Sequence, residues 1–238
     1  MRKVAVIADV HGNAPALAAV LAEIEREDVD LIVSCGDLTW GPLPEETYEL
    51  ARGLNARFVR GNADRAVLEG VSESEREQWM QEHHDQELRD FLATFEDTVS
   101  VEVDGLGPVR LAHGSPRSDE ECVTPETPEK RVREFSAGAD EKVIVTAHIH
   151  IQFDREVAGI RSLNAGSVGL PYETAPGAYW ALLGPDVEFR RTDYDLDATL
   201  ERYRSSGQPN VEQIVEMMLT PPTQREVIEY GEERVFAG

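Results

Sequence analysis

The chain has 238 residues, of which 41% are hydrophobic and 29% charged, and this length and composition favour one large α/β domain over two independent ones. Its formal net charge is -23, from 46 acidic and 23 basic residues. A surface that acidic repels phosphate backbones and argues against long nucleic acid as a partner.

The first sixty residues alternate between apolar strands and helices. Residues 3–8 are β-rich and nearly all apolar, as a buried parallel strand requires. A helix follows Asn13, and the run DLIVSCGD predicts a second strand that ends at Asp37. A helix near 45–53 leads to the run ARFVRGN, which predicts a third strand that ends at Asn62. Because β-α-β crossovers are right-handed, these three strands belong to one parallel sheet.

The rest of the chain predicts further helices and a second sheet. Residues 72–95 carry an apolar stripe at helical spacing and predict one helix. The run VSVEVDGLGPVRLAHG alternates on both sides of Asp104-Gly105, which indicates a β-hairpin. The run KVIVTAHIH predicts another buried strand, and short strands follow at roughly 154–163 and 177–192. We therefore expect two sheets packed face to face with helices outside.

Side chains of the types that bind metals follow five of the predicted strands. They are Asp9, His11, Asp37, Asn62, His113, His148 and His150. In an open α/β sheet the crevice for ligands lies beyond the carboxyl ends of the strands, so these side chains are expected to converge. Mixed histidine and carboxylate ligands suit Zn²⁺, Mn²⁺ or Fe. Seven ligands are too many for one tetrahedral site but fit two metals that share a bridging carboxylate.

Six short motifs carry a family resemblance. The motifs DVHGN, GDLTWGP, RGNAD, AHGSP, AHIH and NAGSVGLP resemble those of the calcineurin-like metallophosphoesterase superfamily, and most of all its small bacterial and archaeal phosphodiesterase-type branch. The resemblance implies a four-layer α/β/β/α sandwich of two mixed sheets flanked by helices. We expect a metallophosphoesterase domain at residues 1–192 and a helical C-terminal extension at 193–238 packed on the same domain.

The resemblance also implies a role for each ligand-type residue. Two divalent transition metal ions (Mn, Zn or Fe) would be held, the first by Asp9, His11 and His150, the second by Asn62, His113 and His148, with Asp37 as the bridge between them. His11 and Asp37 would take part in catalysis, and Asn62 would also contact substrate.

One departure from the family pattern bears on mechanism. The motif RGNAD has Ala63 where catalytically strong members of the superfamily have a histidine that is thought to protonate the leaving group. An alanine cannot transfer a proton, and loss of a general acid removes about 10²–10⁴-fold of rate, least for good leaving groups. The other departures, at Ala147, Ile149 and Ala165, leave every ligand in place.

Two polar residues near the ligands each have two alternative roles. Asn13 is either a substrate contact or the N-cap of the first helix. Arg117, four positions after His113, either holds phosphate oxygens or pairs at the surface with Asp119 or Glu120.

The two histidines outside the ligand set, His83 and His84, lie in the predicted helix 72–95. His84 shares its apolar stripe, which favours a packing role. The segment leaves from the metal face, however, and a histidine on a lid could replace the missing acid.

The function expected from these features is that of a metal-dependent phosphodiesterase for small or nucleotide-type phosphoesters. The alternatives are a weakly active or non-catalytic binding protein on the same fold, as in the retromer subunit, and a small-molecule phosphomonoesterase. Two cysteines without a C-x-x-C motif, no signal-peptide pattern and no long apolar run favour a cytoplasmic protein with no membrane partner. A homo-oligomer through the tail remains open.

Overall fold

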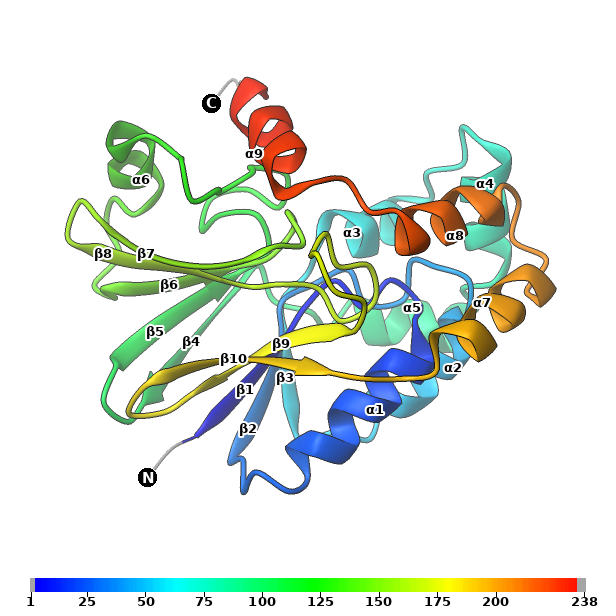
Figure 1. Ribbon diagram of the computed structural model, residues 1–238, viewed down its shortest axis with the longest axis horizontal. Coiled ribbons are helices and arrows are strands. Elements are labelled where there is room, and N and C mark those ends of the chain that lie inside the picture. Colours follow the sequence, from blue (N-terminus) through cyan, green and yellow to red (C-terminus); the bar gives the residue numbers. More distant parts are fainter. Residues whose placement is uncertain (1–2, 235–238) are drawn as a thin grey trace.

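The computed structural model describes residues 3–234 of the chain. The predicted units 1–192 and 193–238 reach beyond this range, so residues 1–2 and 235–238 lie outside the described residues. Two five-stranded sheets pack face to face, with helices on both outer faces (Figure 1). The predicted four-layer α/β/β/α sandwich of two mixed sheets is therefore confirmed.

The first sheet contains the three parallel strands expected from the N-terminal third of the chain. Its order is β10-β9-β1-β2-β3, with β1, β2 and β3 parallel and with β9 antiparallel to both β1 and β10. The bounds are β1 (Val4–Ile7), β2 (Leu31–Ser34), β3 (Ala56–Phe58), β9 (Ala178–Leu183) and β10 (Val187–Thr192).

The second sheet has the order β4-β5-β6-β8-β7. The bounds are β4 (Thr98–Val103), β5 (Gly107–Ala112), β6 (Val143–Thr146), β7 (Gln152–Val157) and β8 (Ile160–Ala165). β4 and β5 form the hairpin predicted at Asp104-Gly105. Valines such as Val33, Val99 and Val145 fill the space between the two sheets, and each contributes about 1.5–3 kcal/mol by leaving water.

Helices cover both outer faces of the sandwich. The first sheet is covered by α1 (Ala14–Ile24), α2 (Pro44–Ala51), α3 (Asn62–Glu69) and α5 (Gln86–Leu92), and the second by α6 (Glu129–Phe135) and α9 (Gln224–Glu233). The remaining helices are α4 (Glu75–Glu82), α7 (Leu196–Ser205) and α8 (Val211–Leu219). Among the described residues, no helix is long and apolar enough to cross a bilayer.

The single helix predicted at 72–95 is wrong, because two helices occupy this segment. α4 ends at Glu82, and α5 begins at Gln86 after Asp85, whose side chain accepts a hydrogen bond from the N–H of Leu88. An aspartate in this capping position starts a new helix, which the continuous apolar stripe had concealed.

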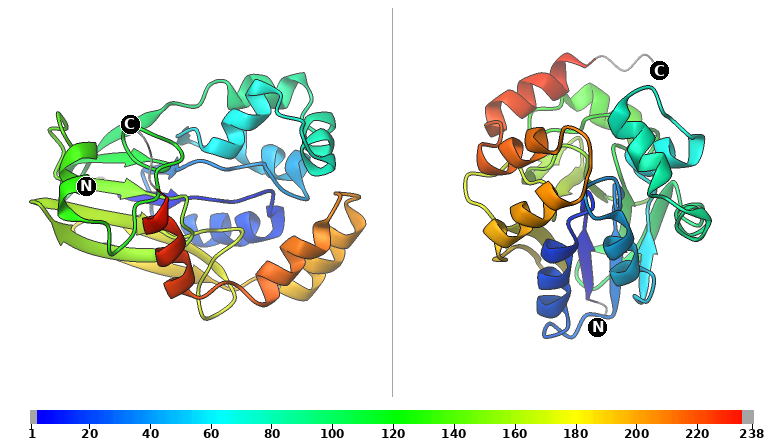
Figure 2. Two further views of the ribbon diagram at one scale, coloured as in Figure 1. Left: turned by 90° about the horizontal axis from the view of Figure 1, so that it is seen from above. Right: turned by 90° about the vertical axis from the view of Figure 1, so that its right-hand side faces the viewer.

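The segments after β3 and after β10 flank the strand ends from opposite sides. In both views of Figure 2, α3, α4 and α5 (cyan) lie on one side of β1 and α7 and α8 (orange) on the other. α7 and α8 pack their apolar faces on loop residues that include Leu43 and Leu170. The two groups of helices therefore frame the edge at which the polar strand ends meet.

Candidate metal centre

The polar strand ends predicted from the sequence meet at one edge of the sandwich. The loop after β1 is held to the loop after β2 by backbone hydrogen bonds from Asp9 N to Gly36 O and from His11 N to Asp37 O. The loop after β6 reaches the same place, where the N–H of His148 donates to the carboxylate of Asp9 at 3.1 Å. Loops from both sheets therefore build one site.

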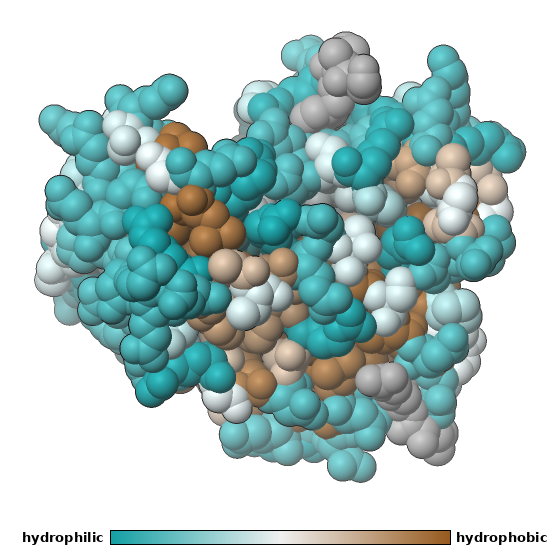
Figure 3. Space-filling model, turned by 180° about the vertical axis from the view of Figure 1, so that it is seen from behind, coloured by the Kyte–Doolittle hydropathy of each residue, from teal (hydrophilic) through white to brown (hydrophobic). Residues whose placement is uncertain are grey.

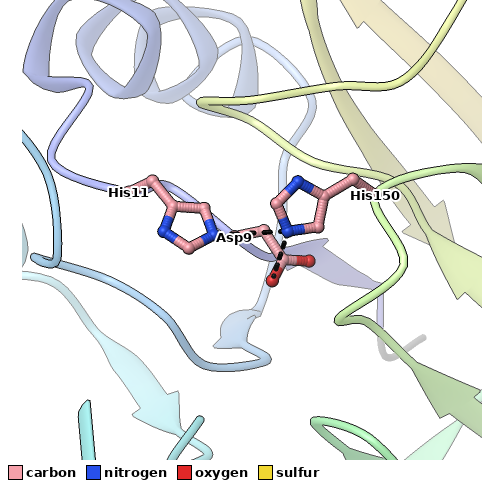
Figure 4. A group of neighbouring side chains, drawn as sticks. All are labelled: Asp9, His11 and His150. Carbon is pink, nitrogen blue, oxygen red and sulfur yellow. Dashed lines mark hydrogen bonds and ion pairs between the residues drawn. The ribbon is translucent and has the colours of Figure 1, made fainter. Parts of the chain in front are cut away.

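Asp9, His11 and His150 form the first cluster (Figure 4). Nε2 of His150 lies 3.2 Å from Nε2 of His11 and 3.4 Å from Oδ1 of Asp9. Each histidine turns Nδ1 towards a backbone carbonyl, that of Trp40 for His11 and that of Leu170 for His150. A carbonyl only accepts, so both Nδ1 atoms carry the proton and both Nε2 atoms carry a lone pair.

The first cluster thus aims three electron-pair donors at one point. Two Nε2 lone pairs face each other, and Oδ1 of Asp9 is buried without a hydrogen-bond partner among the described residues. Three electron-pair donors this close together repel one another, and a bound cation that accepts from all three atoms at once would fit them.

Asp37, His113 and His148 form the second cluster. Nδ1 of His113 donates to the carbonyl of Cys35 at 2.7 Å, which leaves the Nε2 lone pair directed at Oδ1 of Asn62, 2.9 Å away. Two acceptors again face each other, and both fit a metal ion between them.

Asp37 lies between the two clusters. Its Oδ2 is 3.7 Å from Nε2 of His11 in the first cluster and 3.5 Å from Nε2 of His113 in the second. Its Oδ1 accepts the backbone N–H of Ala63 at 2.9 Å, which fixes the carboxylate. One carboxylate within reach of both clusters is the arrangement that a dinuclear centre needs.

Backbone strain is concentrated in the same residues. Among the described non-glycine residues with positive φ are Asp9 at 49°, His11 at 47°, Asp37 at 53°, His148 at 68° and His150 at 60°. Left-handed backbone costs about 1–3 kcal/mol for each such residue and persists where the surrounding structure enforces it. The backbone conformation that turns these five side chains inward therefore lowers the stability of the folded chain.

Asp64, which the sequence analysis did not single out, and Gly61 hold Asp37 in place. The carboxylate of Asp64 accepts the backbone N–H groups of Asp37, Leu38 and Gly61. Burial and the neighbouring Asp37 raise the pKa of Asp64 to about 7. A Cβ on Gly61 would lie 2.1 Å from Oδ1 of Asp37, so only glycine fits there. The sequence could have pointed to Asp64, because this aspartate ends the motif RGNAD, two positions after Asn62.

Electrostatics separate the four histidines of the clusters into two kinds. Burial lowers the pKa of His11 and of His148 to about 4, so both are neutral and able to bind metal at neutral pH. Burial acts the same way on His113 and His150, but the nearby carboxylates of Asp37 and Asp9 outweigh it and raise the pKa of each. These two rings therefore hold a proton more readily than His11 and His148 do.

Asn13 and Arg117 each have partners within the protein. The buried side chain of Asn13 accepts the N–H of Ala16 as the N-cap of α1 and donates to Gly169 O, so the capping reading holds and the substrate contact is not supported. Arg117 forms two hydrogen bonds with the buried carboxylate of Glu121, at 2.9 and 2.7 Å. The predicted surface partners of Arg117, Asp119 and Glu120, bind Arg65 instead.

The two histidines outside the clusters are structural. His84 is buried, with Nδ1 donating to Met80 O at 2.6 Å and Nε2 at 3.0 Å from the hydroxyl of Thr39. His83 stacks on Trp79. The packing role predicted for His84 is therefore confirmed. The alternative, a catalytic acid on a lid, is wrong because the ring is buried and both of its nitrogens already have partners.

A cavity of about 280 Å³ lies over the two clusters. Besides ligand-type residues, it is lined by Ala63 and Arg76 on one side and by Tyr172, Tyr203 and Met217 on the other. A larger cavity of about 920 Å³ adjoins it and shares His148, Tyr172 and Met217 as lining residues.

Comparison with known proteins identifies the class to which this fold and site belong. A sequence model of the calcineurin-like phosphoesterase superfamily domain matches residues 2–184, and the chain belongs to that superfamily.

Three known proteins are similar to this chain. It is similar to a metallophosphoesterase from Sphaerobacter thermophilus, at 26% identity over 92% of this chain and 100% of that one, with a TM-score of 0.77. The hypothetical protein PH1004 from Pyrococcus horikoshii OT3 shares the fold at 20% identity, 94% and 100% coverage and a TM-score of 0.79. The uncharacterized protein MJ0912 from Methanocaldococcus jannaschii is 44% identical over 66 residues, which span 27% of each chain.

Proposed function

We propose that this chain is a metal-dependent phosphodiesterase with a dinuclear centre, acting on small or nucleotide-type phosphoesters. The observation that carries the proposal is Oδ2 of Asp37, which lies within 3.7 Å of both His11 and His113, one from each cluster. In a chain of this superfamily, such a carboxylate supports the bridging role.

The proposed ligands are those expected from the motifs: Asp9, His11 and His150 for the first ion, Asn62, His113 and His148 for the second, and Asp37 for both. When bound, two divalent transition ions (Mn, Zn or Fe) would supply a nucleophile at neutral pH and neutralise charge on the phosphoryl group. The protein's own part is to hold the ligand atoms in these positions and to enclose the substrate in the 280 Å³ cavity.

Two features of the site bear on the choice of substrate. Ala63 lines the cavity where an acid would be needed, so esters of either type with good leaving groups are favoured. The adjoining 920 Å³ cavity offers space for a second organic group on the phosphate. A phosphodiester has such a group and a monoester has none.

The proposal is tested by metal analysis together with hydrolysis of bis-p-nitrophenyl phosphate and p-nitrophenyl phosphate, with Mn²⁺ added. We expect two metal ions per chain and faster hydrolysis of the diester. Asp37→Ala should abolish activity and weaken both metal sites, because the carboxylate lies between the clusters. The control is Asp140→Ala, which removes an exposed carboxylate after α6.

Three other results would contradict the proposal. If Asp37→Ala keeps its full metal content and its full rate of hydrolysis, Asp37 does not bridge the two metals. Metal binding without hydrolysis of either ester would indicate a binding protein on this fold. Faster hydrolysis of the monoester would indicate a phosphomonoesterase.

A further inference from the structure

Arg76 lies in the wall of the cavity over the clusters. It is the second residue of α4, in the segment between β3 and β4. Across the cavity lie Ile214 and Met217 of α8, and in Figure 2 these two groups of helices stand on opposite sides of the strand ends. Arg76 is the one lysine or arginine among the described residues that line this cavity.

Within residues 3–234, the guanidinium of Arg76 forms no hydrogen bond or ion pair with a protein carboxylate, although the nearby charge of Glu77 acts on its pKa. Its Nε atom is buried without a partner among these residues. The adjacent carboxylate of Glu77 instead accepts the N–H of Ser74 and completes the cap of α4. Burial lowers the pKa of Arg76, which reflects the cost of a charge held away from water.

Among the described residues, Arg110, Arg131 and Arg190 also have a buried Nε without a partner, but each of them forms an ion pair with a glutamate, which Arg76 does not. Arg117 binds Glu121 through two hydrogen bonds, Arg65 binds Asp119 and Glu120, and Arg89 donates to three backbone carbonyls. The buried Nε of Arg76 has lost water without gaining an acceptor, and an anion from outside the chain would supply one. The unmet donors of Arg76 face the place where the proposed function puts a phosphoryl group.

We propose that the guanidinium of Arg76 binds the phosphoryl oxygens of the substrate from the side opposite α8, the role that the sequence had offered to Arg117. The inference rests on the proposed function for the identity of the anion. A planar guanidinium offers parallel N–H donors that match two phosphoryl oxygens, and it stays charged at every pH at which the protein is folded. It therefore also stabilises negative charge that develops on the phosphoryl group during the reaction. This matters more here because Ala63 cannot donate a proton to the leaving group.

The test measures binding of inorganic phosphate to the metal-loaded protein by calorimetry, alongside metal content and kcat/KM for bis-p-nitrophenyl phosphate. Arg76→Ala should weaken phosphate binding and lower kcat/KM by about 10- to 100-fold each, with metal content unchanged. Arg76→Lys should restore part of both, because a lysine keeps the charge but not the paired donors. Arg133→Ala, which removes an exposed arginine of α6, is the matched control and should change nothing.

A second comparison separates the two arginine hypotheses. Arg117→Ala should leave phosphate affinity unchanged, since that guanidinium is engaged by Glu121. If Arg117→Ala weakens phosphate binding and Arg76→Ala does not, the inference is wrong. Loss of metal in both Arg76 variants would also overturn it, because Arg76 would then support the metal site and not the substrate.

Failure of this inference is distinguishable from failure of the proposed function. If the wild type binds phosphate through Arg76 but hydrolyses neither ester, the inference stands and the proposed hydrolysis fails. If the wild type hydrolyses the diester and both Arg76 variants bind phosphate as tightly as it does, the function stands and the inference fails.

Discussion

At the scale of single residues, the least expected feature of the site is a methyl group. Ala63 follows Asn62, donates its N–H to Asp37 and presents only its Cβ to the cavity. His84, the sequence's candidate to replace the missing acid, is enclosed between Thr39 and Met80. The described residues therefore offer no histidine outside the clusters that could protonate a leaving group.

The substitution Ala63→His should supply the missing acid. For diesters with poor leaving groups we expect kcat/KM to rise by about 10²-fold, because a histidine there can donate a proton as the bond to the leaving group breaks. The measurement is kcat/KM for aryl phosphodiesters of graded leaving-group pKa, whose steep dependence in the wild type should flatten in Ala63→His. In His84→Ala the steep dependence should persist. An equally steep line in a metal-replete Ala63→His protein would show that the acid was not what limits the wild type.

At the scale of elements, a neutral histidine lies between α4 and α5. The Nδ1–H of His84 donates to Met80 in α4, and its Nε2 accepts from the hydroxyl of Thr39 in the loop after Asp37. A protonated ring would carry a second N–H and a charge into a buried site. Burial accordingly lowers the pKa of His84 to about 4. This ring links the helix pair to the loop that carries Asp37.

This depressed pKa predicts a pH dependence of stability. The unfolded chain takes up the proton near pH 6.5 and the folded chain only near pH 4. The unfolded state therefore binds more protons between these values, and stability falls as the pH falls. The loss should be about 2 kcal/mol at pH 5, out of about 3 kcal/mol in all.

The check is urea unfolding of metal-loaded wild type and His84→Gln at pH 7.5 and pH 5. The wild type should lose about 2 kcal/mol more than the variant between these values, since glutamine does not titrate. Equal losses in the two proteins would mean that His84 is not the group responsible.

At the scale of the whole molecule, charge dominates the surface. The chain carries a formal charge of -23, and hydrophilic residues cover most of the face in Figure 3, with an apolar band across its middle. Large hydrophobic side chains that are exposed include Phe189, Leu219 and Tyr230, which lie on three different elements. These three side chains do not by themselves define an interface, and the possible homo-oligomer stays a prediction.

The excess of acidic residues predicts that salt stabilises the folded chain. Like charges are closer together in the folded state than in the unfolded one, and screening relieves this repulsion. The Tm should therefore rise when NaCl is increased from about 0.02 M to about 0.5 M. Choline chloride at equal ionic strength is the control and should give the same rise. A rise with NaCl alone would indicate specific cation binding instead of screening.

The sequence by itself was enough for the framework of the fold and for the proposed ligands. Runs of apolar residues that end in Asp9, Asp37, His113 or His148 are local patterns, and parallel strands bring their carboxyl ends to one edge whatever the details of packing. The hairpin at Asp104-Gly105 and the helices α7, α8 and α9 also follow from local sequence patterns. The division at 192/193 remains a prediction.

Only the tertiary structure decided which polar groups near the ligands are free to act. Asn13 and Arg117 look like substrate ligands in the sequence, yet each already binds a partner, Gly169 in one case and the buried Glu121 in the other. Arg76 looks like one more surface charge on a polar helix, yet the placement of α4 turns it into the cavity without a partner. The reason is physical: residue type sets what a side chain can bind, but only the packing of distant segments determines whether its donors are already satisfied.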